Sequence, residues 1–104
     1  MKEIIDGKRY DTDTAEMIAE YWNGVPSSDF QYLIEVLYKT KNGAYFLSGE
    51  GGAMTRYSRP VPTGGMCAGS RIIPMDRDRV IEWLERTENY ETLESLFPDS
   101  IEDA

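Results

Sequence analysis

Residues 30–48 read FQYLIEVLYKTKNGAYFLS, in which two apolar segments flank Lys41-Asn42-Gly43. Asn-Gly between such segments is the strongest short-range signal of a β-hairpin, because both residues accept the positive φ angles of a type I′ turn. We therefore predict an antiparallel hairpin of residues 30–40 and 44–48, although residues 29–36 also contain good helix formers. A period of two assigns one face of the first strand to the core. That face carries Phe30, Tyr32, Ile34, Val36 and Tyr38.

The N-terminal part predicts a second hairpin followed by a helix. Asp6-Gly7 separates two short strands, residues 2–5 and 8–11. Asp13 can then cap a helix with Glu16 at N3. This helix should end at Asn23-Gly24. Its apolar residues at helical spacing are Ala15, Ile18, Ala19 and Trp22.

The second half of the chain begins with a glycine-rich segment. Residues 49–69 hold six of the nine glycines and predict a long loop, with short structure only near 54–57. A last strand is expected at 70–73. Asp76 should cap a helix from Arg77 to about Arg86, whose apolar stripe includes Trp83. Residues 87–89 should break it before a second apolar stripe at Tyr90, Leu93, Leu96 and Phe97.

The element order ββαβββαα predicts an α+β fold: a meandering antiparallel sheet of four to five strands with helices packed on one face. We expect a single domain over residues 1–104, with a glycine-rich loop at 49–69 and a frayed acidic C-terminus at 98–104. Trp22 and Trp83 each lie on an apolar stripe of an expected helix. Both are therefore expected in the core.

Composition excludes several classes of protein. The chain has 104 residues, 40% of them hydrophobic, and no apolar run near the roughly 20 residues of a membrane span. Its first residues contain no apolar signal-peptide segment. A lone cysteine, Cys67, forms no internal disulfide, which is typical of a reducing compartment. We expect a cytoplasmic protein that does not contact membranes.

The net charge of −8 is unevenly distributed. Residues 1–38 carry eight acidic and three basic residues, residues 39–71 carry five basic residues against Glu50, and residues 82–104 carry eight acidic residues against Arg86. Direct binding of nucleic acid is not expected, because that affinity comes from cations that neutralise phosphates. A basic protein surface is the more plausible partner. The alternative is that the charge only keeps the protein soluble.

The sequence offers no convincing catalytic, metal or cofactor site. It contains no histidine, the commonest general base and metal ligand. Gly49-Glu50-Gly51-Gly52 lacks the lysine of a phosphate-binding loop, and Cys67 has only arginines to hold a thiolate. Asp11/Asp13 and Asp76/Asp78 lack the rest of an EF-hand motif, and helix capping explains them. We expect no enzymatic activity and no cofactor.

A ladder of acidic residues is the main candidate for binding a partner. Three-residue spacing places helical neighbours about 5–6 Å apart at Cβ, a spacing similar in order to that of phosphates along a nucleic-acid strand. A solvated helix face explains the same pattern. The acidic ladder consists of Glu82, Glu85, Glu88, Glu91 and Glu94.

Four segments together resemble a family of small proteins encoded on conjugative and phage-like mobile elements of Gram-positive bacteria. They are residues 7–15 (GKRYDTDTA), 37–47 (LYKTKNGAYFL), 49–52 (GEGG), and Ile73-Pro74 before the helix with Trp83. The resemblance spans about residues 4–86, and its motifs are turns and caps. It implies a relation to small acidic anti-CRISPR inhibitors of RNA-guided nucleases, and it carries over no catalytic residue.

Three functions follow as hypotheses. The first is a non-enzymatic inhibitor that occupies a basic, nucleic-acid-binding surface of a defence nuclease through the acidic ladder. The second is a structural or accessory domain that binds other proteins through aromatic residues such as Tyr45 and Tyr57. The third, a small enzyme, is disfavoured because no nucleophile–base pair is evident.

Overall fold

The computed structural model describes residues 1–104 and contains eight strands, two α-helices and a short 3-10 helix. The elements are β1 (Lys2–Ile5), β2 (Lys8–Asp11), β3 (Glu16–Trp22), β4 (Leu33–Lys39), β5 (Tyr45–Gly51), β6 (Arg59–Pro60), β7 (Met66–Cys67), β8 (Gly69–Met75), α1 (Arg77–Arg86), α2 (Tyr90–Leu96) and η1 (Pro98–Ser100).

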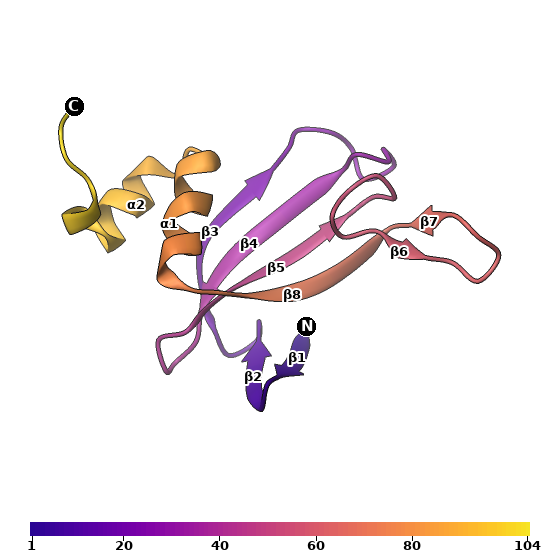
Figure 1. Ribbon diagram of the computed structural model, residues 1–104, viewed down its shortest axis with the longest axis horizontal. Helices are drawn as coiled ribbons and strands as arrows, with labels where there is room; N and C mark the ends of the chain where they lie inside the picture. The colour runs from indigo at the N-terminus through magenta and orange to yellow at the C-terminus, as the bar shows by residue number, and fades with distance from the viewer.

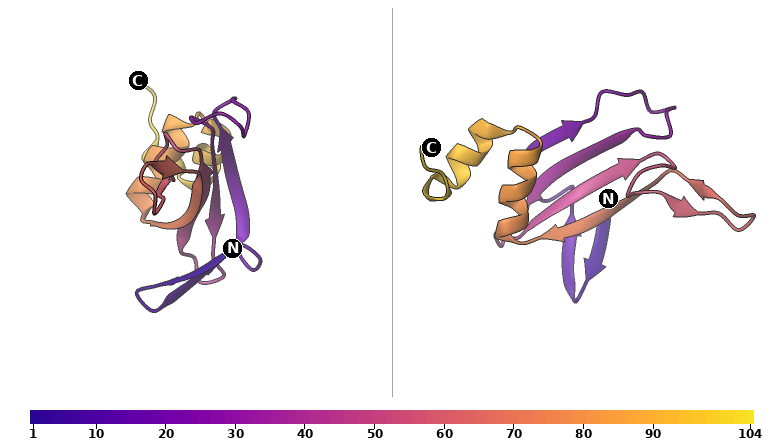
Figure 2. Two further views of the ribbon diagram at one scale, coloured as in Figure 1. Left: turned by 90° about the vertical axis from the view of Figure 1, so that its right-hand side faces the viewer. Right: turned by 45° about the horizontal axis from the view of Figure 1, so that its top comes forward.

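The main sheet has four antiparallel strands in the order β3-β4-β5-β8, a meander in which β6 and β7 are inserted between β5 and β8. The pairs β1-β2 and β6-β7 form two small sheets of their own. Helices α1 and α2 lie at one end of the molecule and the β6–β7 hairpin at the other (Figure 1). With the sheet turned close to edge-on, α1 lies on one side of it (Figure 2, left). The expected α+β class is confirmed.

The central hairpin forms at Asn42-Gly43, where Gly43 has a φ of 88° and Lys39 pairs with Tyr45. The predicted core face of its first strand does reach a hydrophobic cluster, because Tyr38 stacks on the buried Phe46, but it is not the more deeply buried face. Glu35 and Leu37, on the other face, are buried, whereas Phe30 precedes the strand and is 66% exposed. Helix α1 covers the face with Glu35 and Leu37, and the period-two pattern alone does not say which side receives a helix.

The predicted helix ending at Asn23-Gly24 is also wrong, because residues 16–22 form the edge strand β3. A β-bulge between Met17 and Ala19 shifts the register, so Ile18 and Ala19 both pack against the same core. Such a bulge places two consecutive residues against one partner. The apolar residues of this strand are therefore spaced as in an amphipathic helix. The expected element order is corrected to one without this first helix.

Trp22 consequently lies outside the core, contrary to expectation. It is 56% exposed, and its indole Nε1 donates a hydrogen bond to the Val25 carbonyl at 2.8 Å. The capping role assigned to Asp13 is absent as well. Its backbone N–H instead donates to the Asp11 carboxylate at 2.9 Å, in a turn that leads from β2 into β3.

Two hydrophobic clusters pack on opposite faces of the main sheet. Under α1, Leu37 and Leu47 of the sheet contact the helical residues Val80, Trp83, Leu84 and Leu93. On the other face, the β1–β2 hairpin brings Tyr10 against Phe46 and Ile72. The Asp6-Gly7 turn of this hairpin has positive φ at both residues, as predicted.

The glycine-rich segment is more regular than expected. Strand β5 continues to Gly51, and β6 and β7 pair at Arg59 and Cys67.

The C-terminal helices match the prediction. Asp76 caps α1 by accepting from the Arg79 N–H at 2.9 Å, and Glu88, with a φ of 61°, separates α1 from α2. Residues 98–100 of the tail expected to fray form η1.

Candidate functional site

Glu35 is the most unusual residue of the sheet, because it is a carboxylate buried to 2% exposure in the middle of β4. Its Oε1 accepts a hydrogen bond from Trp83 Nε1 at 2.9 Å. Its Oε2 accepts from the Tyr57 hydroxyl at 2.5 Å and from Arg56 Nη1 at 3.3 Å. A buried charge is tolerated when it is paired and hydrogen-bonded in this way. Glu35 thus joins β4, α1 and the loop that carries Arg56 and Tyr57.

That loop, residues 52–58, folds back over the sheet at a position where β5 carries a glycine, Gly49, and so has no side chain. A Cβ atom built on Gly49 would lie 2.0 Å from Cζ of Tyr57, so only glycine leaves room for the ring. The arginines Arg56 and Arg71 each stand 5.6 Å from the centre of that ring. Burial, and then the hydrogen bond to Glu35, raise the pKa of Tyr57 above its ordinary value. Tyr57 therefore remains a hydrogen-bond donor.

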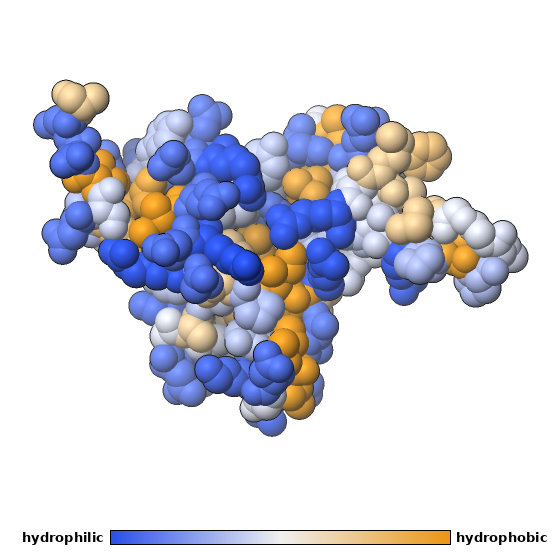
Figure 3. All heavy atoms as spheres, in the orientation of Figure 1, coloured by the Kyte–Doolittle hydropathy of each residue, from blue (hydrophilic) through white to orange (hydrophobic).

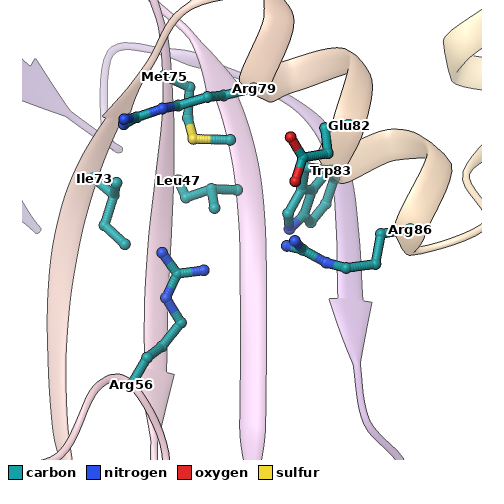
Figure 4. A pocket seen from close by; sticks show the side chains of 8 residues that line it. All are labelled: Leu47, Arg56, Ile73, Met75, Arg79, Glu82, Trp83 and Arg86. Atoms are coloured by element: carbon teal, nitrogen blue, oxygen red, sulfur yellow. The ribbon is translucent and has the colours of Figure 1, made fainter.

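Arg56 projects from this loop into a hollow between the sheet and α1, which we call the arginine hollow. Its volume is about 320 Å³, near the lower limit of small-molecule sites. Ile73 and Met75 of the sheet are its partly exposed apolar lining, whereas Leu47 and Trp83, each 1% exposed, contribute almost no accessible surface. Arg79, Glu82 and Arg86 extend over it from α1, and Arg56 points toward them from the opposite side (Figure 4).

The guanidinium groups around this hollow are almost without partners in the protein. The only ion pair of the structure joins Arg56 to Glu35. Arg79 and Arg86 are seven residues apart, so they project from the same face of α1. A second hollow of about 300 Å³ adjoins the first and shares Arg56 and Arg86 with it. Three arginines thus concentrate positive charge in a protein whose net charge is −8.

The acidic ladder is divided by the bend at Glu88. Its five members are exposed, but Glu82 and Glu85 lie on α1, Glu91 and Glu94 lie on α2, and Glu88 lies between the helices, so they do not form one straight row. Glu82 faces the arginine hollow. Glu85 and Glu94 lie instead around a separate hollow at the helical end, together with Tyr90, Leu93, Ser100, Ile101 and Glu102. In Figure 3 this end shows hydrophobic atoms enclosed by hydrophilic ones.

We call this second feature the acidic hollow, of about 380 Å³. No basic residue lines it, and none of its three carboxylates forms an ion pair. Tyr90 and Ile101 in its surface are 54% and 42% exposed. An apolar centre within a charged rim is the usual anatomy of a protein–protein contact.

Other candidates from the sequence lie elsewhere. Tyr57 is buried and Tyr45 packs against Phe97, so neither offers the free aromatic surface expected for an accessory domain. Cys67 is in β7, in register with Arg59. No group of three or more Asp, Glu, Cys or His side chains is arranged to hold a metal ion.

Sequence reasoning missed Glu35 and the arginine hollow. Glu35 lies on the face of residues 30–40 opposite to the expected core face, so the alternation gave no signal that its side chain is buried. The spacing of Arg79 and Arg86 was an available signal for a shared helix face. Nothing in the sequence indicated that Arg56 would lie opposite them.

Comparisons with protein-family models, curated proteins and solved structures found no significant match to the chain. Neither helix has the length and apolar character needed to cross a membrane.

Proposed function

We propose that the protein is a non-enzymatic binding protein whose acidic hollow docks on a basic surface of a protein partner. The observation that carries this proposal is the combination of three unpaired carboxylates with an exposed apolar centre. Glu85, Glu94 and Glu102 supply the charge, and Tyr90 and Ile101 supply the contact area. Charge of one sign steers association, while desolvated apolar contacts supply most of the affinity.

A surface that ordinarily holds nucleic acid has the complementary chemistry, since it presents clustered lysine and arginine. The resemblance to proteins of mobile elements adds a partner class, an RNA-guided nuclease of bacterial defence. The remaining ladder residues, Glu82, Glu88 and Glu91, extend the negative field around the acidic hollow. Their role in this proposal is long-range attraction, because they lie outside its lining.

The test is capture of the partner by the full chain from a nuclease-treated bacterial lysate, followed by titration of the purified partner in a salt series. We expect the affinity to fall steeply with salt, because salt screens interactions between exposed charges. Added nucleic acid should compete for the same surface of the partner. Binding that is indifferent to both salt and nucleic acid would contradict the proposal.

A charge-matched pair of variants locates the contact. The triple variant Glu85→Gln, Glu94→Gln, Glu102→Gln should weaken binding by about a hundredfold or more, as removal of several close interface charges does. The control variant Asp13→Asn, Glu16→Gln, Glu20→Gln changes the net charge equally at exposed positions of another part of the chain. Equal losses in both variants would mean that only the overall charge matters.

A second candidate function is an accessory domain that binds through the sheet face beside the β1–β2 hairpin. Met17 and Trp22 on that face are 59% and 56% exposed. In this candidate they take the binding role that the sequence suggested for Tyr45 and Tyr57. Exposed tryptophan is enriched at energetically dominant interface positions. This candidate is favoured if Trp22→Ala abolishes capture of the partner while the triple glutamine variant at the acidic hollow does not.

A further inference from the structure

The arginine hollow lies on a different surface from the acidic hollow and has no role in the function proposed above. Arg56 approaches it from the loop over the sheet, while Arg79 and Arg86 approach it from α1 (Figure 4). The three side chains therefore border the hollow from two sides, and like charges repel one another. In a chain with 19 acidic residues, only Glu82 lines this hollow with them.

The position of Arg56 is fixed by buried structure. One nitrogen of its guanidinium donates to Glu35, which is itself held by Tyr57 and Trp83. The other guanidinium donors remain available to the hollow. Because Glu35 is buried and fully hydrogen-bonded, this arginine is oriented before any ligand arrives, which lowers the entropy cost of binding.

The chemistry of the lining indicates the ligand. Guanidinium groups present planar forks of donors that match the oxygens of phosphate. Beside them, the partly exposed Ile73 and Met75 offer an apolar surface that a bare ion would leave unused. The hollow is therefore suited to a phosphate group attached to an apolar or planar body.

The surrounding charge limits the size of that ligand. The net charge of −8 and the acidic ladder on α1 and α2 repel an extended polyanion. A single phosphate group can interact locally with Arg79, Arg86 and the remaining donors of Arg56, whereas a nucleic-acid strand would extend into the acidic surface. We propose that the arginine hollow binds the phosphate group of a small organic phosphate, with its organic part against Ile73 and Met75.

The experiment is a titration of the full chain with phenyl phosphate, followed by NMR of the backbone amides and by calorimetry. We expect saturable binding, with shifts concentrated at α1 and residues 52–58. Inorganic phosphate should bind at least about fivefold more weakly, because it gains no contact with the apolar surface. Phenol, which lacks the phosphate, should not bind.

Two exposed arginines locate the site, and a third provides a control. Arg79→Gln and Arg86→Gln should each weaken phenyl phosphate binding by about tenfold, since each removes charge-assisted hydrogen bonds. Arg59→Gln makes the same charge change on β6, outside the hollow, and should leave the affinity within about twofold because screened distant charges contribute little. Unchanged thermal midpoints establish that the variants fold.

Several results would overturn the proposal. These are absence of saturable binding at millimolar phenyl phosphate, equal weakening by Arg59→Gln, or retained affinity in both α1 variants. Equal affinity for inorganic and phenyl phosphate would refute the assigned organic ligand. A single-stranded oligonucleotide that binds more tightly than phenyl phosphate, with the same arginine dependence, would replace the small ligand with nucleic acid. Each outcome is independent of capture at the acidic hollow.

Discussion

Trp83 Nε1 donates a hydrogen bond to Oε1 of Glu35 at 2.9 Å, although the two residues are 48 positions apart in the chain. Both side chains are almost completely buried. The bond attaches helix α1 to the second strand of the sheet, and the same carboxylate holds Tyr57 and Arg56. Glu35 therefore connects the hydrophobic core to the rim of the arginine hollow.

Removal of this carboxylate should be costly. Glu35→Leu leaves the Tyr57 hydroxyl and the Trp83 N–H buried without an acceptor, and each such group costs about 1–3 kcal/mol. We expect the free energy of unfolding to fall by about 2–5 kcal/mol in urea denaturation, because two buried donors lose their acceptor. Glu20→Gln, an exposed change on β3, should cost less than about 0.5 kcal/mol. Similar values for the two variants would show that the network contributes little.

The two tryptophans should respond very differently to truncation. Trp83 is 1% exposed, and Trp83→Ala should lower the free energy of unfolding by about 3–5 kcal/mol, as large core truncations do. Trp22→Ala removes a side chain that is 56% exposed and one hydrogen bond, so we expect a loss of at most about 1 kcal/mol. Chemical denaturation of both variants measures the difference. A large loss at Trp22 would place it in a packed environment.

Gly49 should not accept a side chain while Tyr57 lies above it. Gly49→Ala places a Cβ within 2.0 Å of the tyrosine ring, so either the ring or the loop must move. We expect a destabilisation of about 1–3 kcal/mol, typical of overpacking. In a Tyr57→Ala background the same substitution should cost clearly less, because the clashing ring is absent. A double-mutant cycle measures this coupling, and additive effects would refute the steric explanation.

Tyr57 should make stability depend on alkaline pH. Burial and the bond to Glu35 raise the pKa of Tyr57 above the ordinary value of 10.0, so folding favours its protonated form. The corresponding stability is present below pH 10 and is lost as pH rises above that value. Tyr57→Phe removes this titration, so its free energy of unfolding should fall less steeply between pH 9.5 and about 11 than that of the parent. Parallel curves in urea denaturation across this range would contradict the assignment.

Local sequence signals were sufficient for the two hairpin turns, the N-terminal cap of α1 and the class of fold. Asp6-Gly7 and Asn42-Gly43 predicted the positions of both hairpin turns correctly, because few residues accept the positive φ found at Asp6, Gly7 and Gly43. Asp76 predicted the start of α1, because its carboxylate satisfies a free N–H of the first turn. The helical spacing of Val80, Trp83 and Leu84 predicted which side of α1 is buried. Each of these signals depends on a few consecutive residues.

Long-range pairing decided the rest. Residues 16–22 have helical spacing, yet they form β3 because β4 offers an unpaired edge and the bulge at Met17/Ala19 places Ile18 and Ala19 on one face. The burial of Glu35 depended on which face α1 covers and on donors from residues 57 and 83. The arginine hollow likewise required the loop of Arg56 to fold over Gly49, opposite Arg79 and Arg86. The sequence alone determined the hairpin turns and the two C-terminal helices because these depend on local backbone energetics, whereas the fold of residues 16–22 and the contacts between distant segments were decided only when the sheet and helix packed together.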